Sequence, residues 1–297
     1  MPHNWSKTEF RDETEVFLKL ADLRRKGWLC RGHAEPYGNL VPSIDRDERK
    51  HLSRIEKLAL ERKSIDVFRS TSRFFASEGE QNALTEDLTT LMLLRHYGVP
   101  TRLLDWSGAP EVATYFASQG NNSVDGEIWC FDYDRYVLKG GEQWKRWPET
   151  TRDNCGEGSE FDADLTMFSI EEPPDWFACF FYKRGFPRQN AQDGAYSLTA
   201  RYGCDHAEAI ETLLADNSCH HRYIVPAKLK PVLRKLLHKN HGIWRGSLFP
   251  DSAGAAETAR TVFDKTPYRI TFQTKQIAYM TNNQFTKIRQ QFPRTTL

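Results

Sequence analysis

The chain has 297 residues, of which 39% are hydrophobic and 27% charged, a composition typical of a globular protein with a core of its own. Eight Trp, eleven Tyr and eighteen Phe exclude a disordered chain, because disordered segments are poor in the aromatic residues that drive burial. Forty-one Lys and Arg against forty Asp and Glu give a net charge of +1, so the overall charge selects no class of partner.

The sequence predicts a cytoplasmic protein without a membrane anchor. Charged residues occur early in the chain and no apolar h-region of a signal peptide follows. No run of about eighteen apolar residues occurs, which excludes a spanning helix. The six cysteines show no C-x-x-C spacing and are expected to be reduced thiols.

The first half of the chain predicts helices that alternate with short extended segments. Gly98 and Pro100 end one of these helices, as a glycine just past a helix and a following proline should. Residues 78–82 are predicted to end the helix expected at 47–75. Helices are expected at 8–26, 47–75, 86–96 and 110–118, and extended segments at 28–30, 101–106 and 126–131.

The second half predicts more strands and one long irregular segment. Residues 137–175 have no period and are expected to form an excursion over the surface or around a cleft. A basic amphipathic helix is expected at 228–239. Strands are expected at 195–199, 222–226, 268–272 and 276–280.

These elements predict an α+β fold, with mixed or antiparallel core sheets flanked by helices. We expect one domain over residues 1–255 and a C-terminal extension over 256–297, docked on the core. Residues 265–297 contain six Lys and Arg interleaved with aromatic residues and no acid. This composition suits phosphate contacts and base stacking, and it equally suits a terminal hairpin docked through its aromatic residues.

Four segments in order resemble the FRG-domain family, a bacterial and phage module. The resemblance covers roughly residues 10–255, and Cys30 stands where the family usually has an aromatic residue. The most specific segment runs from His96-Tyr97-Gly98-Val99-Pro100-Thr101-Arg102-Leu103-Leu104-Asp105-Trp106-Ser107 into Ala113-Thr114-Tyr115-Phe116-Ala117. The others are Trp28-Leu29-Cys30-Arg31-Gly32-His33, Pro187 to Tyr196, and Tyr223 to Asp251.

The order of these motifs is similar to that of the ADP-ribosyltransferase superfamily. By this analogy Arg31, Ser107 and Gln192 occupy the three corner positions of the site, and the substrate is NAD. The resemblance implies an ADP-ribosyltransferase-like enzyme or an NAD-cleaving effector in a toxin or phage-defence setting. The acceptor would be a protein or a nucleic acid.

The same analogy assigns a role to residues of each motif. Arg31 would grip a pyrophosphate, since a guanidinium forms bidentate bonds with phosphate oxygens. His96 would transfer a proton beside the stacking ring of Tyr97. The catalytic residues would be Arg31, Ser107, Gln192 and His96, and the cofactor-binding residues Arg31, Gly32, His33, Tyr97, Arg102 and Trp106.

Several of these residues have equally simple structural explanations. Arg31 would cap a strand end at the surface, and His96 would face the carbonyl end of a helix. Ser107 would cap the helix that starts near Pro110. Arg102 would form a partly buried ion pair with Asp105 that fixes the loop.

Gln192 bears on the enzymatic question. Glycosidic cleavage of NAD passes through an oxocarbenium-like state, which a carboxylate stabilises better than an amide does. Asp193 is adjacent, and on a strand the two side chains would point to opposite faces. Either another acid serves, or the chemistry is absent and the chain is a ligand-sensing or interaction module. A third alternative is a nucleic-acid-binding protein that uses the basic tail.

A metal site is also considered and not expected. Cys204 and His206, with Cys219, His220 and His221, supply enough ligands for one tetrahedral zinc ion. The C-x-H spacing is unusual for such a site, so we expect no metal.

Overall fold

The computed structural model describes residues 4–145, 177–182 and 186–260. The chain divides into two compact units, Met1–Ala256 and Glu257–Leu297, and of the second unit only the end of the last helix is described. Among the described residues, no helix is long and apolar enough to cross a bilayer.

Two predictions therefore fall outside the described residues. They concern the strands at 268–272 and 276–280 and the docking of the basic aromatic extension. The extension is entered by a helix that the sequence did not predict, since α12 covers Ser252–Arg260.

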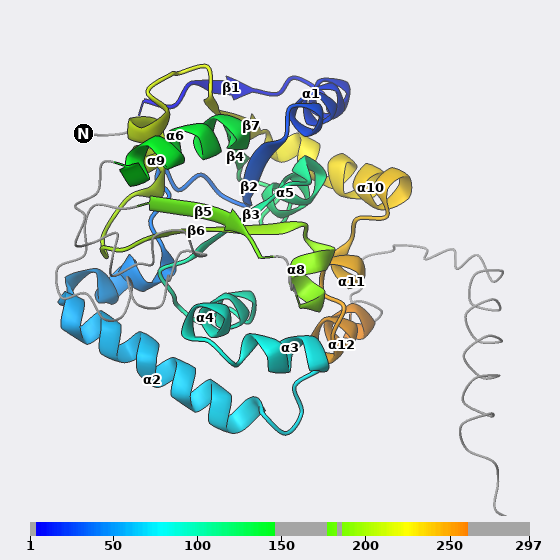
Figure 1. The fold of residues 1–297 in the computed structure, drawn as a ribbon. Helices are drawn as coiled ribbons and strands as arrows, with labels where there is room; N and C mark the ends of the chain where they lie inside the picture. The colour runs from blue at the N-terminus through cyan, green and yellow to red at the C-terminus, as the bar shows by residue number, and fades with distance from the viewer. Residues whose placement is uncertain (1–3, 146–176, 183–185, 261–297) are drawn as a thin grey trace, which may run out of the picture. The chain divides into compact units, whose positions relative to one another are not determined.

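The described strands form one mixed sheet (Figure 1). Its spatial order is β1-β7-β4-β2-β3-β6-β5. β1 runs parallel to β7, and every other pair is antiparallel. The strands are β1 Lys7–Glu9, β2 Trp28–His33, β3 Leu104–Ser107, β4 Gly126–Asp132, β5 Phe177–Phe181, β6 Gly194–Thr199 and β7 His220–Val225.

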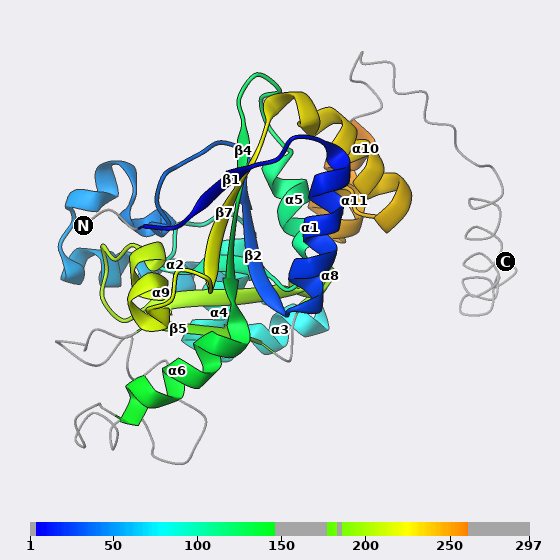
Figure 2. The same ribbon diagram turned by 90° about the horizontal axis from the view of Figure 1, so that it is seen from above.

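The two halves of this sheet meet at β2 and β3. Within these two fully described strands, the only paired residues are Cys30 and Ser107, so the strands diverge from that point. Seen from above, β1, β7, β4 and β2 run across the direction of β5 (Figure 2). Divergence of two neighbouring strands leaves room between them for side chains, and this is where Arg31 lies.

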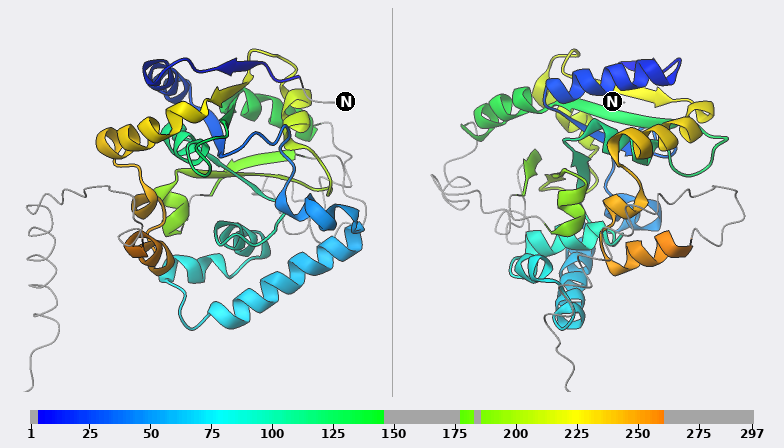
Figure 3. Two further views of the ribbon diagram at one scale, coloured as in Figure 1. Left: turned by 180° about the vertical axis from the view of Figure 1, so that it is seen from behind. Right: turned by 90° about the vertical axis from the view of Figure 1, so that its right-hand side faces the viewer.

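Helices cover both halves of the sheet, which confirms the predicted α+β class. α1, α5 and α10 cover one face of the first half, and α9 lies on the other. α2 and α4 lie beneath β5 and β6 (Figure 3). The helices are α1 Glu13–Arg25, α2 Arg54–Ser72, α3 Glu78–Ala83, α4 Asp87–His96, α5 Pro110–Ala117, α6 Tyr133–Lys145, α8 Pro187–Ala191, α9 His206–Leu214, α10 Lys230–His241, α11 Arg245–Leu248 and α12 Ser252–Arg260, with 3-10 turns at Ser43–Asp45, Asp47–His51 and Ala227–Leu229.

Capping residues set the helix boundaries and correct several predictions. Ser53 and Glu56 form a capping box that starts α2, so the helix predicted from residue 47 is preceded by a 3-10 turn. Ser77 and Glu80 form a second capping box, and the predicted break at 78–82 is instead the helix α3. Propensity alone missed both, because the caps depend on side-chain to backbone bonds.

Two further predictions about chain segments were wrong. Residues 133–145 form the helix α6, so the irregular segment predicted for 137–175 is helical over 137–145, and the rest of it lies outside the described residues. The N-terminal helix begins at Glu13 after the N-cap Asp12, and Lys7–Glu9 is an edge strand instead.

α5 packs unusually close to the sheet because glycines face it. A Cβ on Gly32 would lie 1.8 Å from the carbonyl oxygen of Ala113, and one on Gly126 would lie 2.0 Å from that of Ala117. No side chain fits at either position. Gly32, which the analogy assigned to cofactor binding, thus has a packing role in this fold.

Candidate functional site

Charged side chains gather where β2 and β3 diverge. Arg31 is 8% exposed, and its Nη1 donates to the Asp105 carbonyl oxygen at 2.6 Å and lies 3.1 Å from the Asp105 carboxylate. Arg95 at the end of α4 donates from Nε to the same carboxylate and from Nη1 to Ser43 at 3.4 Å. One carboxylate thus holds two guanidinium groups from different elements.

A third arginine stands beside this pair. Arg46 is half-buried, and its Nε donates to the Val41 carbonyl at 2.7 Å. Its backbone N–H donates to the Ser43 carbonyl at 3.4 Å, and Arg95 donates to the hydroxyl of the same serine, so Ser43 lies between the two arginines. Burial and the charge of Arg95 lower the pKa of Arg46, while Asp105 opposes them. We call Arg31, Arg46, Arg95 and Asp105 the Asp105 cluster.

The charges of the Asp105 cluster do not balance. Burial and the charges of Arg95 and Arg46 lower the pKa of Arg31, Asp105 opposes them, and the result is a pKa of about 10. The guanidinium is therefore still protonated at neutral pH. Burial would raise the pKa of Asp105, but Arg95 and Arg31 outweigh it and hold the pKa well below its usual range. Two cations therefore contact one carboxylate and Arg46 adds a third positive charge close by, an excess that suits an anionic ligand.

The carboxylate of the cluster is accessible. The side chain of Asp105 is 34% exposed and that of Arg95 is 18% exposed. Within the described part of the chain, the Nη2 of Arg31 has no hydrogen-bond partner. A buried guanidinium with an unused donor beside an exposed carboxylate can bind an oxygen of a ligand.

A chain of hydrogen bonds fixes Arg31 from behind. Arg31 Nε donates to His33 Nε2 at 2.9 Å, so the proton of the neutral imidazole sits on Nδ1, 3.3 Å from Glu127 Oε1. Glu127 also accepts from Arg222 at 2.7 Å. Burial lowers the pKa of His33 to about 4, and this keeps Nε2 free to accept at neutral pH. His33 thus positions Arg31 and has no free nitrogen for a ligand.

His96 lies at the margin of the cluster. Its Nε2 is hydrogen-bonded to Tyr196 Oη at 2.7 Å, and Tyr196 is the neighbour of Asp105 across β3 and β6. Burial lowers the pKa of His96 to about 4, so the ring is neutral at physiological pH.

Tyr97 belongs to a second group of contacts. Its hydroxyl donates to Glu80 at 2.5 Å, and the Arg188 guanidinium lies 4.4 Å from the ring centre. Arg188 in turn binds Asp251 and donates to the His96 carbonyl at 2.7 Å. These contacts tie the end of α4 to α8 and to the segment before α12.

Ser107 and Gln192 meet, but away from Arg31's contacts with Asp105. The Ser107 hydroxyl donates to the Gln192 carbonyl at 2.6 Å and accepts from the Ala109 N–H at 3.0 Å, which secures the start of α5. The Gln192 amide donates to the Leu248 carbonyl at 3.1 Å. Gln192 ends α8 and is not on a strand, so the predicted alternation with Asp193 was wrong.

The remaining predicted residues lie in the core. Trp106 is buried and donates to Ser197 at 2.7 Å. Arg102 is buried with Glu61, at 2.6 Å, and Tyr202. The predicted ion pair between Arg102 and Asp105 is therefore wrong.

The main feature missed by sequence reasoning is Asp105 as the centre of a site, together with Arg46 and Arg95. Asp105 stands in the apolar run Leu103-Leu104-Asp105-Trp106, and a carboxylate there is itself a signal. Arg46 carried no signal, because it comes from the segment after β2, far from Asp105 in the sequence. Arg95 lies only 10 residues before Asp105, but the chain turns at Gly98 between them and no regular spacing joins the two.

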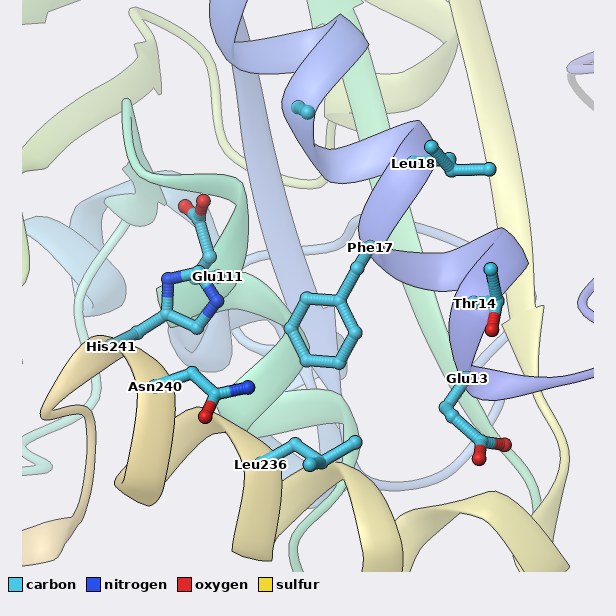
Figure 4. Close-up of a pocket in the computed structure, with 9 residues that line it drawn as sticks. Glu13, Thr14, Phe17, Leu18, Glu111, Leu236, Asn240 and His241 are labelled. Carbon is cyan, nitrogen blue, oxygen red and sulfur yellow. The ribbon is translucent and has the colours of Figure 1, made fainter.

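Two other features bear on possible ligands. Among the described residues, no three His, Cys, Asp or Glu side chains are arranged to hold a metal ion. A surface groove lies between α1 and α10, next to α5, and is lined by Phe17, Leu236 and His241 among others (Figure 4). None of the predicted site residues lines it.

Residues 26–126 match the FRG domain family model, so the chain carries an FRG domain. The matched segment contains every member of the Asp105 cluster. No curated protein and no solved structure matches the chain.

Proposed function

We propose that the chain is an ADP-ribosyltransferase-like enzyme that binds NAD at the Asp105 cluster and cleaves its bond to nicotinamide. The observation that carries the proposal is that Arg31 and Arg95 both contact the partly exposed carboxylate of Asp105, with Arg46 on the far side of Ser43 from Arg95. NAD has the matching chemistry, since its pyrophosphate is anionic and its ribose becomes cationic during cleavage.

The roles follow from position and charge. Arg31, held by His33, offers Nη2 to a phosphate oxygen, and Arg46 offers a second guanidinium. Asp105 stays ionised and stabilises the oxocarbenium-like ribose. In this proposal Asp105 supplies the negative charge that the neutral side chain of Gln192 lacks.

The reaction balances without a further reagent. The bond between ribose C1 and the nicotinamide nitrogen breaks, and nicotinamide leaves with the electron pair. Water, or a nucleophile on a protein or nucleic acid, attacks C1 and loses its proton. With water the products are ADP-ribose, nicotinamide and a proton.

Nicotinamide release from NAD by the purified full-length protein tests the proposal. Asp105→Asn should lower kcat by roughly 100-fold or more, the order found when a single electrostatic stabiliser is removed. Arg46→Ala should raise KM roughly 10-fold, as loss of a charge-assisted hydrogen bond does. Arg25→Ala is the matched control, since Arg25 is an arginine of α1 whose side chain is 78% exposed.

Thermal unfolding with and without NAD separates the alternatives. Stabilisation by NAD without nicotinamide release would support a ligand-sensing module at the same cluster. A folded protein that neither releases nicotinamide nor is stabilised by NAD would refute the proposed function.

A further inference from the structure

Tyr37 presents an aromatic ring beside the Asp105 cluster. It lies in the loop after β2, and its side chain is exposed, with 55% of the residue accessible. Its backbone N–H donates to Glu127 Oε1 at 3.0 Å, on the carboxylate that also binds His33. The ring is thus exposed on a loop whose backbone is anchored to a buried group.

The contacts of the ring leave much of its surface free. The His33 ring meets it edge to face, with centres 5.1 Å apart and planes at 78°. The Arg46 guanidinium lies 5.5 Å from the ring centre. An anchored ring with this much accessible surface is a suitable platform for a planar base, because stacking needs an open face and little ordering on binding.

Arg46 connects the ring to the charges of the cluster. Its guanidinium contacts Tyr37, and its backbone N–H binds Ser43, which also accepts from Arg95. The Tyr37 ring also meets His33, the partner of Arg31. In a nucleotide, one ribose separates the base from its phosphates, so the two subsites must be adjacent. Tyr97, the ring that sequence reasoning selected for stacking, is held by Glu80 and Arg188 instead.

We infer that Tyr37 stacks on the adenine of an adenine nucleotide whose phosphates are bound by Arg46 and Arg31. The inference rests on the proposed function and adds to it which end of the dinucleotide lies at the loop after β2. It assigns binding of the base to a residue that takes no part in the cleavage step.

Calorimetric titration of the full-length protein with pyrophosphate and with ADP tests this assignment. ADP should bind roughly 10- to 100-fold more tightly than pyrophosphate, the range expected when one base stacks on an aromatic side chain. Tyr37→Leu should abolish this difference and leave the affinity for pyrophosphate unchanged. Tyr37→Phe should retain the difference, and Phe74→Leu, at a 79% exposed ring elsewhere, is the control.

The possible outcomes distinguish a failure of this inference from a failure of the proposed function. If Tyr37→Leu keeps the preference for ADP while Arg46→Ala weakens both ligands, the stacking assignment is wrong and the anion site stands. If the folded wild-type protein binds neither pyrophosphate nor ADP, the proposed NAD site itself is refuted.

Discussion

Arg102 illustrates at the residue scale how a buried charge is satisfied. It is 1% exposed, and Glu61 accepts from its backbone N–H at 2.9 Å and its Nε at 2.8 Å. Burial would lower the pKa of Arg102, but Glu61 outweighs it and raises the pKa. The pair joins the middle of α2 to the start of β3, so its energy belongs to the fold.

Removal of the Glu61 carboxylate should therefore destabilise the folded protein. Glu61→Gln keeps the shape of the side chain but leaves Arg102 buried without a counter-charge, and a loss of about 3–5 kcal/mol in the free energy of unfolding is expected. Urea denaturation measures it. Tyr202→Phe, which removes a hydroxyl that donates to Glu61 at 2.6 Å and accepts from Arg102 but leaves the ion pair in place, should cost less, about 2 kcal/mol. Equal effects of the two substitutions would contradict this explanation.

The same residue shows why spacing misled the sequence interpretation. Arg102 and Asp105 are three apart, but Arg102 lies at a bend before β3 while Asp105 is on the strand, so their side chains take different directions. Arg102 faces α2, while Asp105 faces the arginines near β2. Glu61 and Arg31 come from elements far away in the sequence, and no local pattern marks them.

At the scale of elements, the packing of α5 on β2 and β4 positions the candidate site. β3 leads directly into α5, and Ser107 bonds the turn between them. Gly32 and Gly126 allow α5 to lie against the sheet. The course of β3, and with it the place of Asp105, depends on this close approach.

Gly32→Ala tests this dependence. The new Cβ would meet the backbone of α5, so a loss of about 3 kcal/mol or more is expected, with displacement of α5. Gly140→Ala is the control, because its nearest neighbour is the Tyr136 ring at 3.8 Å and alanine favours a helix interior by up to about 1 kcal/mol. Gly32→Ala should lower the midpoints of thermal and urea unfolding, and Gly140→Ala should leave them unchanged or raise them. A destabilising effect of Gly140→Ala comparable to that of Gly32→Ala would argue against the packing role.

At the scale of the whole molecule, buried histidines couple stability to pH. Burial lowers the pKa of His33 and of His96 to about 4 and that of His206 to about 3, all below the ordinary value of about 6.5. Between these values the unfolded chain binds protons that the folded chain does not. Stability therefore falls as the pH decreases from about 6.5 towards 4.

Urea unfolding at pH 7, 6 and 5 should show this fall. Three groups give a limiting slope of up to about 4 kcal/mol per pH unit. His33→Gln should reduce the slope by up to about 1.4 kcal/mol per pH unit, since one proton less is taken up on unfolding. His51→Gln, at an exposed position, should leave it unchanged. A slope that is the same in wild type and His33→Gln would contradict the assignment of His33 as a neutral buried acceptor.

The sequence by itself determined the fold class, the family resemblance that the match to residues 26–126 supports, and Arg31 as a candidate. These follow from local information, namely periodicity, caps and motif order. The tertiary structure alone decided which charges meet. Arg95 meets Asp105 because α4 ends beside β3. Arg31 and Asp105 come together because β2 and β3 are neighbours that diverge after Cys30 and Ser107, and a contact between residues so far apart leaves no trace in local spacing. For the same reason Ser107 and Gln192, which the motif order placed in the site, bond each other and the backbone instead.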